Sequence, residues 1–381
     1  MEVDLNLIGS NIRAVRAWIG PSRKLLCVVK ANAYGHGAVA VARRAQIEGA
    51  DFLGVAMVEE GIELRHAGIE IPILVLGGFE PTQIASLAEA RLTPSVYSLG
   101  TLSALLDAGR RRGKPIPFHL EVDTGMGRLG LPSRDLGAAL DRMAALTHPA
   151  LEGIYTVLAS GEKADSPRTA EQLRLFNHAV QEVKRRGLSP AFIHVANSGG
   201  VLNTPDTWFN MVRPGLAIYG VAPAEVSPVL DLAPALSFRT KILLLKDAPS
   251  GTHVGYGGAY TTDRESRIAT LAVGYDDGLD RRLDSGGRVL IRGRRAPIVG
   301  RISMDLTTVD VTGIPGVSEG DEATIIGRQG DEWITVWEPA NLCRTIPWEL
   351  LCRIGSRVPR IYIGEGAAAP VASRFETPSR R

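Results

Sequence analysis

The chain has 381 residues, of which 45% are hydrophobic and 22% are charged, an ordinary globular composition. Lysine and arginine number 43 and aspartate and glutamate 41, so the net charge of +2 argues against a nucleic-acid-binding surface or a polybasic membrane anchor. No apolar run approaches the ~18 residues of a membrane span, and the first residues lack the apolar segment of a signal peptide. The length leaves room for two or three domains, or for one barrel with an addition.

Three cysteines, Cys27, Cys343 and Cys352, cannot all pair within one chain. They form neither a C-x-x-C motif nor another metal-ligand spacing. We therefore expect reduced, packed thiols in a cytoplasmic protein, and no metal site.

Over the first 230 residues, short apolar runs typical of buried strands alternate with longer segments of helical periodicity. The strand candidates are Leu25–Lys30, Phe52–Ala56, Ile73–Leu76, Thr93–Val96, Phe118–Val122, Gly153–Thr156, Phe192–Ala196 and Met211–Val212. The helical candidates are Asn6–Ile19, Val39–Glu48, Val58–Ala67, Pro81–Ala90, Ser98–Arg111, Leu136–Leu146 and Thr169–Arg186. Eight strands alternating with helices predict a closed (β/α)₈ barrel over residues 1–230. A doubly wound open sheet is the rival, because one false strand would change the count.

After about residue 230 the pattern changes to short β-rich runs separated by glycine-containing pairs. The runs are Leu236–Leu245, Arg267–Val273, Val289–Ile291, Ala296–Val299, Thr307–Val311, Ala323–Ile326 and Val358–Ile363. Short helices are predicted near Trp337–Leu342 and Trp348–Ile354. We expect a second, mostly β domain over residues 231–364 and a disordered tail over residues 365–381, which is rich in Ala, Pro, Ser and Arg.

The sharpest local signal is Lys30, which closes a strand of otherwise apolar residues and is followed by the turn Asn32-Ala33-Tyr34-Gly35-His36. In a barrel, the residues at the C-terminal ends of the strands face the active site. A lysine that is desolvated there has a lowered pKa and can act as a nucleophile. The competing explanation is a lysine whose stem is packed while its amine reaches water or an ion-pair partner.

Six short motifs, in the same order along the chain, resemble those of the alanine racemases. They are VKANAYGHG at 29–37, LEVDTGMGRLG at 120–130, HVANS at 194–198, NMVRPGLAIYG at 210–220, GYGG at 255–258 and GRISMD at 300–305. The resemblance spans roughly residues 4–363. It implies a barrel followed by a β domain, in agreement with the strand and helix pattern.

The resemblance implies a pyridoxal 5'-phosphate enzyme that racemises alanine by two-base proton exchange at Cα. Lys30 matches the lysine that forms the Schiff base and serves the D-enantiomer, and Tyr256 matches the base that serves the L-enantiomer. Without the resemblance, Tyr256 would be better explained as a loop tyrosine bonded to backbone. The competing explanation of Arg213 is a barrel-end arginine in a salt bridge. The family places Tyr256 and Met304 in the partner subunit's site, so a homodimer with shared active sites is implied.

Further site residues are also implied by the resemblance. The residues that would bind the cofactor are Lys30, Tyr34, Asn197, Ser198, Arg213, Gly215 and Leu216, with Arg213 facing the pyridine nitrogen. Arg128 and the backbone amide of Met304 would bind the substrate carboxylate, for which the forked guanidinium is suited. Tyr275 resembles a tyrosine at the entrance to the pocket.

Three positions depart from the family pattern. Glu121 stands where many members carry a carbamylated lysine, Val157 replaces a histidine that hydrogen-bonds near the catalytic tyrosine, and Ser356 replaces a tyrosine that some members use against the phosphate. Glutamate keeps the negative charge of a carbamate, whereas valine can neither donate nor accept a hydrogen bond. We therefore expect a working enzyme of altered rate or specificity, in which Val157→His would change turnover.

The leading hypothesis is an alanine racemase that supplies D-alanine for peptidoglycan. One alternative is a racemase of broader specificity, for example for serine. Another is a pyridoxal-phosphate-binding homologue with weak catalysis, against which the β domain argues. Neither a nucleic acid nor a membrane is expected as a partner.

Overall fold

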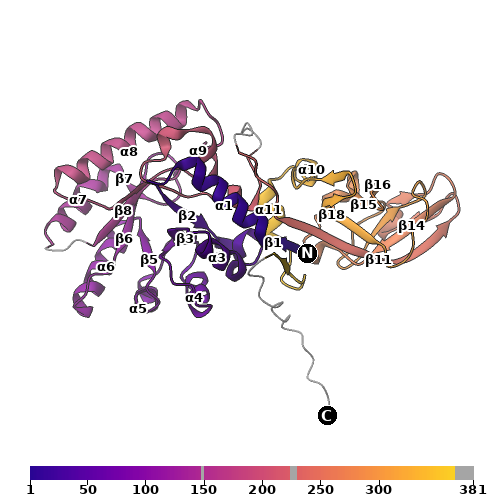
Figure 1. Ribbon diagram of the computed structural model, residues 1–381, viewed down its shortest axis with the longest axis horizontal. Coiled ribbons are helices and arrows are strands. Elements are labelled where there is room, and N and C mark those ends of the chain that lie inside the picture. The colour runs from indigo at the N-terminus through magenta and orange to yellow at the C-terminus, as the bar shows by residue number, and fades with distance from the viewer. Residues whose placement is uncertain (147–149, 224–229, 365–381) are drawn as a thin grey trace, which may run out of the picture. The chain divides into compact units, whose positions relative to one another are not determined.

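The computed structural model describes residues 1–146, 150–223 and 230–364 (Figure 1). The contacts among its residues divide the chain into two compact units. The N-terminal unit comprises Asn6–Ala33 and Ala38–Pro234, and the C-terminal unit combines Met1–Leu5 and Tyr34–Gly37 with the residues from Ala235 onward. The expected tail over residues 365–381 lies outside the described residues.

A closed barrel forms the core of the N-terminal unit. Its strands are β2 (Lys24–Val28), β3 (Phe52–Val55), β4 (Ile73–Val75), β5 (Thr93–Val96), β6 (Phe118–Asp123), β8 (Leu151–Tyr155), β9 (Phe192–His194) and β10 (Met211–Val212). Each strand pairs in parallel with the next, and the pairing of β10 with β2 closes the ring. The predicted barrel is confirmed, and the open-sheet alternative is wrong. The two-residue strand β7 (Leu131–Pro132) pairs only with β6.

Helices surround the barrel and follow the apolar periodicity of the sequence. They are α1 (Leu5–Ile19), α3 (Ala38–Ile47), α4 (Val58–His66), α5 (Ile84–Glu89), α6 (Leu99–Arg112), α7 (Ser133–Ala144), α8 (Pro167–Arg185) and α9 (Ser198–Asn203). From α3 to α8, each helix contacts the next one in chain order (Figure 1). The longest, α8, buries Phe176, Ala179, Val180 and Val183 along one stripe, and Ser166 caps its first turn. Within the described part of the chain, no helix is both long and apolar enough to cross a membrane.

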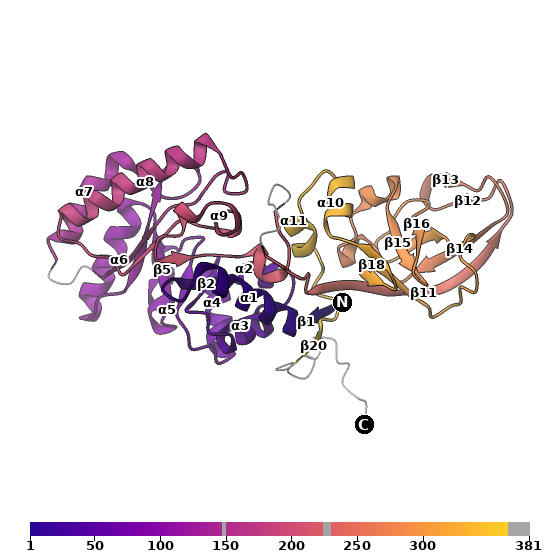
Figure 2. The same cartoon turned by 45° about the horizontal axis from the view of Figure 1, so that its top comes forward.

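The C-terminal unit is mostly β, as predicted. Its strands are β1 (Glu2–Asp4), β11 (Leu236–Ala248), β12 (His253–Val254), β13 (Tyr260–Thr261), β14 (Ser266–Leu271), β15 (Arg288–Ile291), β16 (Arg294–Pro297), β17 (Thr307–Asp310), β18 (Glu322–Gln329), β19 (Glu332–Ile334) and β20 (Ile361–Ile363). The long strand β11 organises the sheet, because β1, β14 and β18 all pair with it (Figure 2). Two short helices, α10 (Trp337–Leu342) and α11 (Pro347–Cys352), lie close to the predicted positions.

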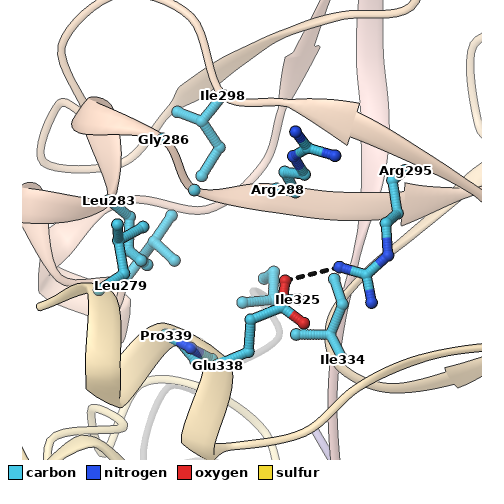
Figure 3. A pocket seen from close by; sticks show the side chains of 12 residues that line it. Leu279, Leu283, Gly286, Arg288, Arg295, Ile298, Ile325, Ile334, Glu338 and Pro339 are labelled. Atoms are coloured by element: carbon cyan, nitrogen blue, oxygen red, sulfur yellow. Dashed lines mark hydrogen bonds and ion pairs between the residues drawn. The ribbon is translucent and has the colours of Figure 1, made fainter.

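A cavity of about 420 Å³ lies inside the C-terminal unit, among α10, β15, β16 and β18 (Figure 3). Much of its wall is aliphatic and includes Leu279, Leu283 and Ile298. Arg295 projects from the wall but donates to Glu338 at 2.6 Å and to Glu332 at 2.9 Å, so its charge is compensated locally. The predicted site residues do not line this cavity.

Candidate active site

The predicted site residues of the N-terminal unit all follow the C-terminal ends of barrel strands. Lys30 follows β2, Arg128 follows β6, Asn197 and Ser198 follow β9, and Arg213 to Leu216 follow β10. Because the strands of a closed parallel barrel all end at the same mouth, the topology gathers these side chains at one end of the unit. This mouth is the usual position of the active site in such a barrel.

Lys30 stands at the start of an unusual turn, α2 (Lys30–Tyr34). Ala31, Asn32, Ala33 and Tyr34 have φ between 51° and 53°, so the chain makes a left-handed helical turn without glycine. A left-handed conformation costs an L-residue of this kind roughly 1–2 kcal/mol. Four such residues in succession therefore persist only because the surrounding structure holds them.

Two polar side chains fix this turn. The Glu60 carboxylate accepts the amide of Ala31 at 2.7 Å through one oxygen and the amide of Ala56 at 2.6 Å through the other, and thereby ties the turn to the end of β3. The Asn32 side chain accepts the amide of Ala38 at 2.8 Å, which joins the turn to the start of α3. The backbone beside Lys30 is thus held from both sides.

Backbone amides converge on the hydroxyl of Ser198, the first residue of α9. The amides of Gly215 and Ala217 donate to Ser198 Oγ at 2.9 and 3.2 Å. Asn197 caps α9 by accepting the amide of Gly200 at 3.1 Å. Backbone amides that converge in this way are a kind of donor set that suits a phosphate.

Arg213 is buried, with 6% of its surface exposed, and its guanidinium is fully oriented by the barrel. One nitrogen donates to His194 Nδ1 at 2.7 Å, and the other donates to the carbonyl oxygens of Thr156 and Val195 at 2.9 and 3.1 Å. Burial lowers the pKa of Arg213 to about 10, while Tyr155 and then Glu121 act in the opposite direction. Arg213 therefore stays positively charged at neutral pH.

Arg128 lies in a loop that a single carboxylate shapes. Asp123, the last residue of β6, accepts the amides of Gly125, Met126 and Gly127 at 2.9, 3.0 and 3.1 Å through one oxygen. This bonding turns the chain sharply and leaves Arg128 exposed at the end of the loop. An exposed guanidinium at the mouth is available to a carboxylate.

The remaining predicted residues belong to the C-terminal unit. Tyr256 is 73% exposed, and with Arg301 and Ser303 it lines an open cavity of about 560 Å³. Met304 is 51% exposed. Its segment lies against Gly274, where a Cβ atom would come within 2.2 Å of the Met304 carbonyl oxygen, so only glycine fits.

Tyr275 and Tyr34 complete the predicted set. Tyr275 is 42% exposed, and its amide donates to the carbonyl oxygen of Ser303 at 3.0 Å. Burial, with Cys352 adding to it, raises the pKa of the Tyr34 phenol above its ordinary value. Tyr34 therefore remains a protonated hydrogen-bond donor.

The three departures from the family pattern have different surroundings. Glu121 is 3% exposed and lies 2.9 Å from the hydroxyl of Tyr155; burial raises the pKa of this carboxyl, and the Tyr155 hydrogen bond opposes that rise. The carbonyl oxygen of Val157 accepts from Gln172 at 2.9 Å. Ser356 is exposed.

Two histidines that lie behind Arg213 were not predicted to belong to the site. His194 was noticed only as part of the HVANS motif, yet it is the acceptor for Arg213, and His119 lies directly behind it. The available signal was a histidine within each of two mainly apolar strand patterns, Phe118–Val122 and Phe192–Ala196.

Comparisons with known proteins agree with the fold and with the motifs. The family model of the alanine racemase N-terminal domain matches residues 3–223, and that of the C-terminal domain matches residues 235–362. The alanine racemase of Symbiobacterium thermophilum is 46% identical over 367 residues, which cover 96% of this chain and 97% of the relative. Alanine racemase 2 of Caldanaerobacter subterraneus is 41% identical, with 96% and 95% covered.

Solved structures are similar over the same length. Alanine racemase of Clostridium difficile 630 superposes with a TM-score of 0.91 at 32% identity and covers 97% of this chain and 96% of its own. The Bacillus anthracis enzyme with bound L-Ala-P gives 0.88 at 38% identity, with 96% and 95% covered. The Bartonella henselae enzyme with covalently bound pyridoxal phosphate gives 0.87 at 31% identity, with 95% and 98% covered. The chain belongs to the alanine racemase family.

Proposed function

We propose that this protein is an alanine racemase, which interconverts L-alanine and D-alanine by removing the Cα proton from one face and returning a proton to the other. The observation that carries the proposal is the donor set at the barrel mouth. It combines Lys30 at a strand end, the buried cation Arg213, and two amides converging on Ser198. Relatives that are named alanine racemases match over nearly the whole chain.

The residues at the mouth fit pyridoxal 5'-phosphate. Ser198 and the amides of Gly215 and Leu216 would hold its phosphate together with Tyr34, and Asn197 would order this cradle by capping α9. Lys30 would carry the cofactor covalently. When bound, pyridoxal phosphate supplies an electron sink that stabilises the negative charge left on Cα.

Arg213 would face the pyridine nitrogen. A guanidinium does not readily give up its proton, and Arg213 is held by three acceptors in the barrel wall. The ring nitrogen would therefore stay largely unprotonated and the electron sink would be moderate. Simple proton exchange is then favoured over side reactions such as transamination.

Two bases on opposite faces of Cα are needed. We assign the D-enantiomer to the amine of Lys30 and the L-enantiomer to the phenol of Tyr256. Arg128 and the backbone amide of Met304 would hold the substrate carboxylate, so that Cα stays between the two bases.

We propose that the enzyme works as a homodimer, with Tyr256 and Met304 completing the partner subunit's site. The exposure of Tyr256, Met304 and Leu306, at 73%, 51% and 42%, supports an interface in this part of the C-terminal unit. We assign residues 1–230 to the cofactor-holding domain and residues 231–364 to the domain that supplies Tyr256. From membership of the family, we also propose that the protein is cytoplasmic and that its D-alanine is used for peptidoglycan.

The test is racemisation by the cofactor-loaded protein, followed from each alanine enantiomer by chiral chromatography. Lys30→Ala and Tyr256→Phe should each lower kcat by about 10²- to 10⁴-fold, the usual contribution of a general base. Tyr256→Phe should still exchange the Cα proton of D-alanine with solvent deuterium, because Lys30 serves that enantiomer. Tyr260→Phe, which changes a tyrosine packed near Ala248 and Ile268, is the matched control and should keep activity. Wild-type racemisation by Tyr256→Phe would refute the two-base assignment.

A further inference from the structure

A row of polar side chains crosses the interior of the barrel behind Arg213. The guanidinium of Arg213 lies 2.7 Å from His194 Nδ1, and His194 Nε2 lies 2.8 Å from His119 Nδ1. His119 Nε2 faces Glu152 Oε2 at 3.4 Å. Both histidines are fully buried, whereas the Glu152 side chain is 31% exposed.

The row runs from one end of the barrel to the other. Arg213 follows the C-terminal end of β10, where the predicted site residues gather. His119 and Glu152 are the second residues of β6 and β8, at the N-terminal end. Glu152 also accepts from the hydroxyl of Thr93, the first residue of β5, at 3.4 Å.

The guanidinium selects one set of tautomers for the row from the Arg213 end. Arginine can only donate, so His194 Nδ1 must accept and the proton of the neutral ring must be on Nε2. That proton is donated to His119 Nδ1, so the proton of His119 is on Nε2 and points toward Glu152. Burial lowers the pKa of both histidines, and Arg213 lowers that of His194 further, so both rings are neutral at pH 7.

The surroundings of His119 show that this position is built for an imidazole. Gly153 on the neighbouring strand β8 has no side chain, and a Cβ there would lie 2.6 Å from His119 Nδ1. The rings of Phe52 and Phe192 enclose the imidazole, with centroids 6.1 and 5.8 Å away. Among the described residues, His119 Nε2 makes no hydrogen bond of good geometry, which leaves the Glu152 carboxylate as the acceptor that it faces.

Tyr155 and Glu121 are ionisable groups beside the row. The ring of Tyr155 stacks on His194 at 4.8 Å with an interplanar angle of 9° and lies under the Arg213 guanidinium at 5.0 Å. Its hydroxyl lies 2.9 Å from a carboxyl oxygen of Glu121. Among the described residues, these groups and Glu152 at the far end are the titratable neighbours that could disturb the two imidazoles.

Building on the proposed function, we propose that Glu152 and His119 are positioning residues, which hold the donor pattern of Arg213 from the opposite end of the barrel by fixing the tautomer of His194. Without an acceptor at Glu152, the N–H of His119 would be buried without a partner, and the reversed row, in which His119 Nδ1–H donates to His194 Nε2, would become more favourable. His194 would then protonate Nδ1 and oppose the guanidinium. Arg213 would then lose its hydrogen bond to His194, although Arg213 does not contact Glu152 and is not itself substituted.

The direct test reads the tautomers in cofactor-loaded protein labelled with ¹⁵N-histidine, through two-bond ¹H–¹⁵N correlations. Wild type should show His119 and His194 as neutral Nε2–H tautomers. Glu152→Gln keeps an acceptor and should preserve both tautomers, with kcat within about twofold of wild type. Glu152→Leu should change the His119 tautomer and lower kcat about tenfold at unchanged KM, the equivalent of one misaligned hydrogen bond.

Glu182→Leu is the matched control, because it removes a 20% exposed carboxylate that pairs with Arg186 on the outer helix α8. It should leave the tautomers and kcat unchanged. An Nδ1–H tautomer of His119 in wild type would overturn the inference even if Glu152→Leu did not fold, and so would a Glu152→Leu variant with wild-type tautomers. If wild type failed to racemise alanine, the proposed function would fall, but the tautomers would still decide this inference.

Discussion

At the scale of single residues, the barrel core holds two histidines that remain uncharged. Burial is the largest cause of the lowered pKa of both His119 and His194. An unfolded chain takes up a proton on each histidine below about pH 6.5, whereas the folded protein does not. The unfolded state then binds more protons, so these two groups make the free energy of unfolding fall as the pH falls.

This gives a prediction for denaturant unfolding. Between pH 7.5 and pH 5.5, each histidine that stays neutral in the fold should lower the free energy of unfolding by about 1.4 kcal/mol. His119→Leu should therefore show a pH-dependent loss about 1.4 kcal/mol smaller than that of wild type. Burial raises the pKa of Glu121, so above its unfolded pKa this group makes the free energy of unfolding fall as the pH rises. Both proteins contain Glu121, so its contribution cancels in the comparison. Equal pH dependence of the two proteins would mean that His119 titrates normally in the fold.

At the scale of elements, the left-handed turn α2 is the most strained segment next to a predicted catalytic residue. Ala31 and Ala138 are both exposed alanines, but Ala31 has φ of 53°, whereas Ala138 lies inside the right-handed helix α7. Glycine adopts a left-handed conformation without steric cost, yet it weakens a right-handed helix. The same substitution should thus have opposite consequences at the two positions.

Ala138→Gly should lower the free energy of unfolding by about 1 kcal/mol, the usual cost of glycine in a helix. Ala31→Gly should leave it unchanged or raise it by up to about 1 kcal/mol, because relief of the left-handed strain offsets the added freedom of the unfolded chain. Urea unfolding of the two variants at the same pH measures the difference. A loss at Ala31 as large as that at Ala138 would show that the turn is not strained.

The elements differ in how far local sequence determines them. Most barrel strands were predictable because they are short, mainly apolar runs bounded by turn residues. Helices such as α8 were predictable because they carry a continuous buried stripe. The strand β1 was missed, because three residues carry no periodic signal and this one is stabilised by pairing with β11 and β20 far along the chain. The turn α2 was missed because an Ala-Asn-Ala sequence does not by itself favour positive φ.

The site shows the same division. The position of Lys30, Arg213 and Ser198 at one mouth was predictable, because each follows a predicted strand and the barrel gathers strand ends there. The row from Arg213 to Glu152 was not, because it depends on which strands are neighbours. His119 and His194 are 75 residues apart in sequence and meet only because β6 and β9 both flank β8.

At the scale of the whole molecule, the net charge of +2 hides a local concentration of cations. Lys30, Arg128 and Arg213 all follow strand ends at one mouth, where the proposal places a phosphate and a carboxylate. The proposed second base is instead in the C-terminal unit, on a largely exposed Tyr256. One chain would then supply half of each of two active sites, and the dimer would be the catalytic unit.

Shared sites predict complementation between two inactive variants. Lys30→Ala and Tyr256→Phe subunits should each form dimers of very low activity. In a mixed dimer, the wild-type Lys30 of one subunit meets the wild-type Tyr256 of the other, while the second site carries both substitutions. Random assembly of equal amounts makes about half of the dimers mixed, so about a quarter of the wild-type activity should return.

Co-expression with two affinity tags isolates the mixed dimer, which should have about half of the wild-type kcat per dimer, since one of its two sites is intact. If Lys30 and Tyr256 served the same site from one chain, every site would contain a substitution and mixing would restore no activity.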